Sequence, residues 1–103
     1  MDAALVLDLV KARLGISSTV RDTYLTAIIE GVITELEDAQ GLVLDDANPY
    51  HLMFVVDYAT WRYQSVIEPS HIPGRVPLPM PRHLQFRLHN LIVEQKAGAS
   101  DDI

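Results

Sequence analysis

The sequence contains no cysteine, and this absence removes several kinds of chemistry at once. A chain without thiols forms no disulfide and offers no thiolate nucleophile or thiolate metal ligand. The fold must therefore be held by packing alone. With 103 residues, of which 49% are hydrophobic, the chain is long enough for one hydrophobic core and not for two. We expect a single domain.

Long apolar runs are also missing. No run approaches the roughly 18 residues of a membrane span, and acidic Asp2 stands where a secretory signal would be basic, so we expect no membrane contact and synthesis in the cytoplasm. The formal net charge of -6 argues against a general nucleic-acid binder. Residues 69–93 nevertheless contain no acidic residue. The basic residues of this segment are His71, Arg75, Arg82, His83, Arg87 and His89.

Motifs for catalysis and cofactor binding are scarce as well. The five glycines form no phosphate-binding fingerprint, and the serines lie in caps, loops or the C-terminal tail without a nucleophile motif. Metal ligands on one helix face would need i, i+3 or i+4 spacing, whereas His83 and His89 point about 240° apart. We therefore expect no enzyme activity, no cofactor and no metal site.

Helical periodicity, by contrast, is abundant. Residues 3–14 carry an aliphatic stripe ahead of Gly15, a residue type that commonly ends helices. A second helix is predicted from near Thr19, which follows two serines as a candidate N-cap, to about Ala39 or Gln40 before Gly41. Its apolar side follows the i, i+3, i+4, i+7 pattern through Leu25, Ile28, Ile29, Val32, Ile33 and Leu36.

The other side of this second helix carries small residues. A glycine inside a helix costs about 1 kcal/mol relative to alanine, and a closely packed neighbour over Ala27 and Gly31 would justify that cost. A tolerated surface glycine is an equal alternative. The sequence leaves the choice open.

The stretch from Asn48 to Ser65 is the centre of the sequence pattern. Asn48 is a predicted N-cap and Pro49 a predicted first helical residue. One side of the helix is aliphatic, with Leu52, Val55, Val56, Ala59 and Tyr63, and the opposite side carries Phe54, Tyr58 and Trp61. A surface helix needs only one apolar side. We predict that the first set holds the subunit together and that the second set faces another layer or subunit.

Asp57 lies on the same helix and admits two interpretations. An acid among apolar residues can be a catalytic group with a raised pKa. Alternatively, its i, i+4 spacing to Trp61 lets it accept a hydrogen bond from the indole N–H. The structural interpretation is favoured.

After this helix, residues 66–80 contain four prolines and Gly74, which exclude a helix. A connection of this length is uncommon in a compact domain and tends to be functional. Pro81 begins a last predicted helix, which has leucines on one side and Phe86 and Val93 nearly opposite. It is predicted to end near Lys96, followed by a flexible C-terminal tail over residues 97–103.

The predicted fold class is therefore all-α. Four helices form one domain over residues 1–96, with a long Pro-rich loop between the third and fourth helices. One function compatible with this fold is a small helical DNA-binding regulator that uses the arginines of the last helix. The leucines on that helix argue against it, because packing claims much of its surface, and no paired recognition helix is evident.

Taken in order, the helical segments resemble one protein family. The segments are LVKARLGI, RDTYLTAIIEGVITELEDAQGL, NPYHLMFVVDYATWRYQS, a Pro-rich loop and MPRHLQFRLHNLIV. Over about residues 4–94 they are similar to the small head-tail connector proteins of long-tailed bacteriophages, also called head-completion or adaptor proteins. The most specific pieces are LGI after the first helix, the D-Y-A-x-W-R-Y run from Asp57 and the P-R-x-L-Q-x-R-x-H-N-L run from Pro81.

The resemblance implies a structural protein of the virion, located at the head-tail junction. Such proteins are not enzymes. They form a ring, usually twelve-fold, beneath the portal protein, extend the DNA channel and provide the docking surface for stopper or tail-completion proteins. Double-stranded DNA passes through the channel without sequence-specific binding.

A ring of subunits packed side by side would account for the second apolar sides. The candidate subunit or partner interface residues are Ala27, Gly31, Phe54, Tyr58, Trp61, Arg62, Phe86 and Val93. The candidate portal or channel contacts are His71, Arg75, Arg82, Arg87 and Lys96.

Overall fold

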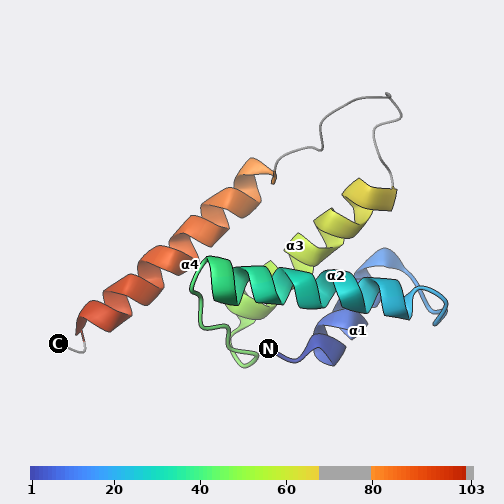
Figure 1. Ribbon diagram of the computed structural model, residues 1–103, viewed down its shortest axis with the longest axis horizontal. Coiled ribbons are helices and arrows are strands. Elements are labelled where there is room, and N and C mark those ends of the chain that lie inside the picture. Colours follow the sequence, from blue (N-terminus) through green and yellow to red (C-terminus); the bar gives the residue numbers. More distant parts are fainter. Residues whose placement is uncertain (68–79, 102–103) are drawn as a thin grey trace.

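The computed structural model describes residues 1–67 and 80–101, with side-chain surroundings for residues 1–65 and 80–97. The elements are α1 (Ala3–Leu14), α2 (Asp22–Thr34), the π-helical turn η1 (Glu35–Ala39), α3 (Pro49–Ile67) and α4 (Arg82–Asp101). The described residues thus form four α-helices and no strand, which confirms the all-α prediction (Figure 1). Most of the predicted Pro-rich loop, residues 68–79, lies outside the described residues.

The ends of α1 follow the sequence signals. The side chain of Asp2 accepts a hydrogen bond from the backbone N–H of Ala4. At the other end Gly15 adopts a φ of 72°, a left-handed conformation that suits glycine. The backbone N–H of Ile16 then donates to the carbonyl of Lys11 at 2.9 Å. The predicted bounds of this helix are confirmed.

The second helix begins later than predicted and passes into a π-helical turn before its end. Thr19 is not the side-chain cap: its carbonyl accepts from the N–H of Asp22, where α2 begins. At its C-terminal end α2 continues directly into η1, in which the N–H of Gln40 reaches back five residues to the carbonyl of Glu35. Gly41 then turns the chain with a φ of 70°, so the predicted end of the helical segment is confirmed.

Helix α3 occupies the centre of the fold. Asn48 caps it by accepting from the N–H of Tyr50 at 2.9 Å, and Pro49 is its first residue, as predicted. It contacts α1, α2 and α4 (Figure 1). Because neighbours surround it, both of its apolar sides are buried within the one chain. The core residues are Val6, Val10, Leu25, Ile29, Val32, Ile33, Leu36, Leu42, Leu44, Phe54, Val55, Val56, Tyr58, Ala59, Tyr63, Leu84 and Leu91.

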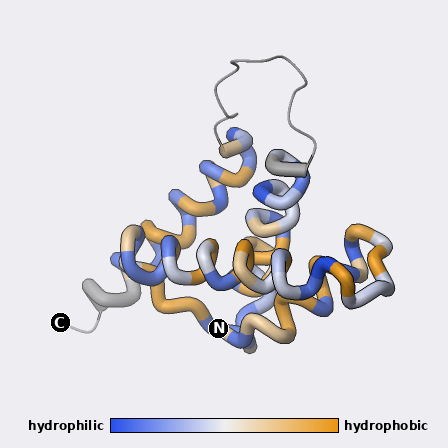
Figure 2. Tube along the Cα trace, turned by 45° about the vertical axis from the view of Figure 1, so that its right-hand side comes forward, coloured by the Kyte–Doolittle hydropathy of each residue, from blue (hydrophilic) through white to orange (hydrophobic). Residues whose placement is uncertain are grey.

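Helix α4 lies at the edge of the molecule and runs antiparallel to α3 (Figure 1). Among the described elements it contacts α3 alone, through a side that includes Leu84 and Leu91. Blue and orange alternate along it in Figure 2, as expected for a helix with unlike sides. It continues to Asp101, so the predicted end of the helix near Lys96 is wrong. The alanines that follow Lys96 favour helix, and no proline stops it.

One polar residue fastens α4 to the segment after η1. The side-chain amide of Gln95 donates to the carbonyl of Gly41 at 2.6 Å and accepts from the N–H of Val43 at 2.7 Å. A single glutamine thereby satisfies two backbone groups of an extended segment. This contact holds the C-terminal half of α4 beside the chain that leads into α3.

Candidate assembly surface

The structure separates the predicted interface residues into two groups, and the first group is internal. Phe54 is fully buried and Tyr58 is 3% exposed within the single chain. Phe54 faces α4, where Arg87 lies over its ring at 5.5 Å, and Tyr58 reaches Glu35 of η1. The prediction that these two aromatic residues face another subunit is therefore wrong, because α4 and η1 already cover that side of α3.

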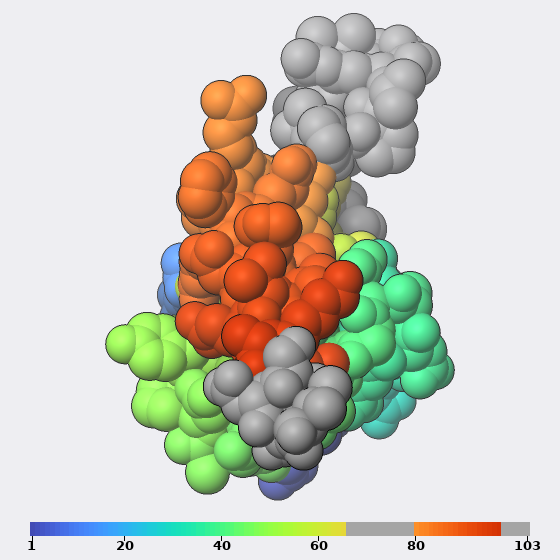
Figure 3. Space-filling model, turned by 90° about the vertical axis from the view of Figure 1, so that its left-hand side faces the viewer, coloured from blue at the N-terminus to red at the C-terminus, as the bar shows by residue number. Residues whose placement is uncertain are grey.

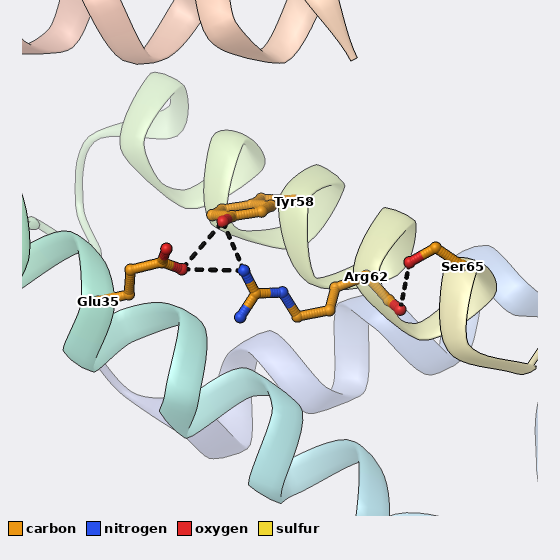
Figure 4. Close-up of polar contacts among 4 residues, drawn as sticks. All are labelled: Glu35, Tyr58, Arg62 and Ser65. Atoms are coloured by element: carbon orange, nitrogen blue, oxygen red, sulfur yellow. Dashed lines mark hydrogen bonds and ion pairs between the residues drawn. The ribbon is translucent and has the colours of Figure 1, made fainter. Parts of the chain in front are cut away.

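Arg62 also belongs to the fold. Its Nη2 donates to Oε2 of Glu35 at 3.0 Å and to the Tyr58 hydroxyl at 2.7 Å, and that hydroxyl donates to the same Glu35 oxygen at 2.9 Å (Figure 4). Burial, followed by the hydrogen bond to Glu35, raises the pKa of Tyr58 above its ordinary value of 10.0. The three side chains connect α3 to the π-helical turn, so Arg62 is not a free interface residue.

Trp61 shares features of the buried group and the exposed group. It is partly buried and stacks on Tyr58, with ring centroids 6.0 Å apart and planes inclined by 28°. Part of its surface thus supports the core, and the rest remains accessible.

Asp57 joins three helices. Its Oδ1 accepts from Nη1 of Arg13 on α1, and its Oδ2 accepts from Nη1 of Arg87 on α4 at 2.6 Å. The expected partner, the indole of Trp61, is replaced by these two guanidinium groups. Arg87 therefore has an ion-pair partner within the chain, while its side chain remains 36% exposed, so its role as a portal or channel contact stays a prediction.

A pocket of about 330 Å³ lies beside this ion-paired cluster. Its lining residues include Asp57, Thr60 and His83. Both oxygens of the carboxylate accept hydrogen bonds from arginines, and the buried Thr60 hydroxyl has no hydrogen-bond partner among the described residues. The arrangement offers a cross-link between helices rather than a nucleophile activated by a neighbouring base.

The second group of predicted interface residues is exposed. Phe86 is 67% exposed and Val93 is 48% exposed, and both lie on the side of α4 that faces away from α3. Figure 3 looks onto this side of α4, which lies between η1 and the chain that begins α3. Ala27 and Gly31 are exposed on α2. A Cβ built on Gly31 would meet nothing within 4 Å, so no neighbour in the described part of the chain explains this glycine.

The basic residues predicted to contact the portal or channel differ in their surroundings. Arg82 is exposed at the first position of α4 and forms no ion pair within the described residues. Lys96 is exposed on the same helix and takes part in a polar interaction. His71 and Arg75 lie outside the described residues. The outer side of α4 is therefore both apolar and basic.

Several exposed apolar residues are not among the predicted interface residues, including Val20 and Tyr24, which are 88% and 45% exposed near the start of α2. Val43, Tyr50 and Met53 are 74%, 80% and 41% exposed around the start of α3. Tyr50 also lines a pocket of about 220 Å³ together with residues of α4, including Asn90 and Glu94. Helical periodicity places Tyr50, four residues before Phe54, on the aromatic side of α3, but it does not show that this end of the helix is uncovered. A loop residue such as Val43 has no helical periodicity.

The described part of the chain contains no group of three or more His, Cys, Asp or Glu residues arranged to hold a metal ion. None of its helices combines the length and the apolar composition of a membrane span.

The fold and the site define the class: a small all-helical domain whose edge helix exposes an apolar and basic side. Comparison with protein-family models, with curated proteins and with solved structures found no match for the chain.

Proposed function

We propose that this chain is a structural adaptor at the head-tail junction of a long-tailed bacteriophage. In this role, copies of the chain form a ring on the portal protein, extend the DNA channel and present a docking surface to a stopper or tail-completion protein. The protein works by assembly rather than by chemistry. The particular expectation is a twelve-fold ring, in keeping with the resemblance of the sequence to head-tail connectors.

The observation that carries the proposal is the exposed side of α4. Phe86 and Val93 are large apolar residues on one side of one helix, and the core of the subunit leaves both uncovered. Single exposed apolar residues are ordinary, but a row of them beside further exposed apolar side chains is typical of a protein interaction surface. In a protein that assembles, these uncovered side chains would be buried in an interface.

The alternative of a DNA-binding regulator gains no support from the cations of α4. Arg87 is occupied by Asp57 at 2.6 Å. Leu84 and Leu91 are buried against the core, which fixes the inner side of the helix. Arg82 alone among the predicted arginine contacts of the described residues is left exposed without an ion pair. One arginine is a weak basis for phosphate binding, which is stabilised by several cations together.

Co-sedimentation with the purified portal protein of the phage that encodes this chain tests the proposal. The expected result is that the portal retains the chain in a fixed stoichiometry that saturates. An unrelated ring protein of similar charge serves as the control and retains none. If the portal does not retain the chain at any ratio, the proposed function is wrong.

A further inference from the structure

The outer side of α4 carries a regular row of residues. Arg82, Phe86, His89, Val93 and Lys96 follow one another at spacings of four, three, four and three, and all are exposed. This spacing keeps them within a narrow stripe on one side of a helix. The stripe is apolar at Phe86 and Val93, with basic residues before, between and after them. We call it the α4 stripe.

The outer side of α2, together with the η1 turn that continues it, has a row with the same spacing and the opposite character. Thr23, Ala27, Glu30, Thr34 and Glu37 are also separated by four, three, four and three residues, and all are exposed. Where the α4 stripe has the bulky residues Phe86 and Val93, this row has the small residues Thr34 and Ala27. Its two carboxylates, Glu30 and Glu37, are fewer than the three basic residues of the α4 stripe, because its remaining member is Thr23. Glu30 and Glu37 form no ion pair within the described residues. We call it the α2 stripe.

The two stripes cannot meet within one subunit. Among the described elements α2 contacts α1, α3 and η1, and α4 contacts only α3. Complementary surfaces on different parts of the same chain can satisfy each other only between copies. Such a contact is heterologous, because each copy uses a different surface, and a heterologous contact that closes produces a ring.

We infer that the α4 stripe of one copy docks antiparallel on the α2 stripe of a second copy. In the antiparallel register Arg82 faces Glu37 and His89 faces Glu30, while Phe86 and Val93 lie over Thr34 and Ala27. The parallel register would require Lys96 to pair with Glu37, although Lys96 already takes part in another interaction. Small residues along α2 let the axes approach to about 8–10 Å, the usual distance of packed helices.

This inference rests on the proposed function in that it names the contact that would join neighbouring copies of the ring. A single helix pair buries less than the roughly 1,200 Å² of the smaller stable interfaces. The contact between two free chains is therefore expected to be weak and to gain strength when the ring closes. A test must therefore capture the contact covalently, because a binding measurement on free chains would not detect so weak a contact.

Disulfide trapping is well suited to this chain, because it has no cysteine of its own. Full-length Ala27→Cys and Val93→Cys chains are prepared separately, mixed and oxidised, and Asp8→Cys on the exposed side of α1 replaces Ala27→Cys in the control mixture. We expect the first mixture to yield a cross-linked heterodimer and the control mixture to yield none. Cross-linking of Val93→Cys with itself, equal yields in both mixtures, or no cross-link would overturn the inference.

Charge reversal adds a second test. Adding Arg82→Glu to the Val93→Cys chain should reduce the cross-link to the level of the control, and adding Glu37→Arg to the Ala27→Cys chain should restore it. Both substitutions are at exposed positions, and circular dichroism checks that the helices persist. A loss without restoration contradicts the antiparallel register. Portal retention of the wild-type chain is a separate measurement, so failure of this contact and failure of the proposed function are distinguishable.

Discussion

Nη1 of Arg87 on α4 donates to Oδ2 of Asp57 on α3 at 2.6 Å, while Arg13 of α1 occupies the other oxygen of the same carboxylate. Asp57 is 19% exposed, whereas the side chains of Arg87 and Arg13 are 36% and 53% exposed. One carboxylate thus ties the edge helix and the first helix to the centre of the fold. Its removal leaves two guanidinium groups without their partner.

We therefore predict that Asp57→Asn lowers the free energy of unfolding by about 1–2 kcal/mol, a value reduced from that of a buried pair because the arginines are partly solvated. Urea denaturation measures the change. Asp8→Asn, an exposed acid with no described ion pair, should change stability by less than about 0.5 kcal/mol. Equal effects of the two substitutions would show that the Asp57 cluster does not stabilise the fold.

The two phenylalanines of the chain offer a direct test of which aromatic residues hold the subunit together. Phe54 is fully buried and Phe86 is 67% exposed. Phe54→Ala should destabilise the isolated subunit by about 3–5 kcal/mol, because it leaves a cavity, and Phe86→Ala by no more than about 0.5 kcal/mol. Thermal unfolding of both variants provides the comparison. The reverse order would contradict the assigned core.

The raised pKa of Tyr58 determines how the stability of the protein should change at alkaline pH. Its native pKa is raised above 10.0 by burial and by its hydrogen bond to Glu35. Above pH 10 the unfolded state releases the phenolic proton before the native state does, so the native state is destabilised as the pH rises through the native pKa. Tyr58→Phe should make the loss of stability above pH 10 less steep. Denaturation at a series of alkaline pH values measures it, and an unchanged slope would contradict the assigned pKa direction.

One substitution at Gly31 tests both the stability of the subunit and the proposed contact between copies. Its backbone is helical and a methyl group added at its Cα would meet no atom within 4 Å, so Gly31→Ala should stabilise the free subunit by about 0.4–1 kcal/mol. The same methyl group would stand at the edge of the α2 stripe. We predict that the more stable variant gives less of the Ala27–Val93 cross-link. A variant that gains stability and cross-links as well as the parent would remove Gly31 from the contact.

The local signals in the sequence predicted much of the fold. Gly15, Gly41 and Asn48 mark helix ends where the structure has them, because positive φ angles and side-chain caps depend on a few neighbouring residues. Thr19 failed as a cap, since the backbone of the turn before α2 provides its own hydrogen bonds. The π-helical turn had no local signal.

Contacts between residues far apart in the sequence were harder to predict. Periodicity showed that α3 has two apolar sides, but it could not show that α4 and η1 cover the second one. The partners of Asp57 lie 44 and 30 residues away in the chain, whereas Trp61 was the only candidate within reach of a local pattern. The exposed side of α4, in contrast, was correctly separated from its buried side, because both sides belong to one regular helix.

The proposed adaptor role is tested most sharply by electron microscopy of the full-length chain bound to the portal protein of the proposed phage. We expect a closed ring of copies, coaxial with the portal, whose opening continues the DNA channel. Within that ring the α4 stripe of each subunit should lie against the α2 stripe of its neighbour. Saturated samples in which the portal carries no ring, or in which the chain binds only as isolated copies, would contradict the account.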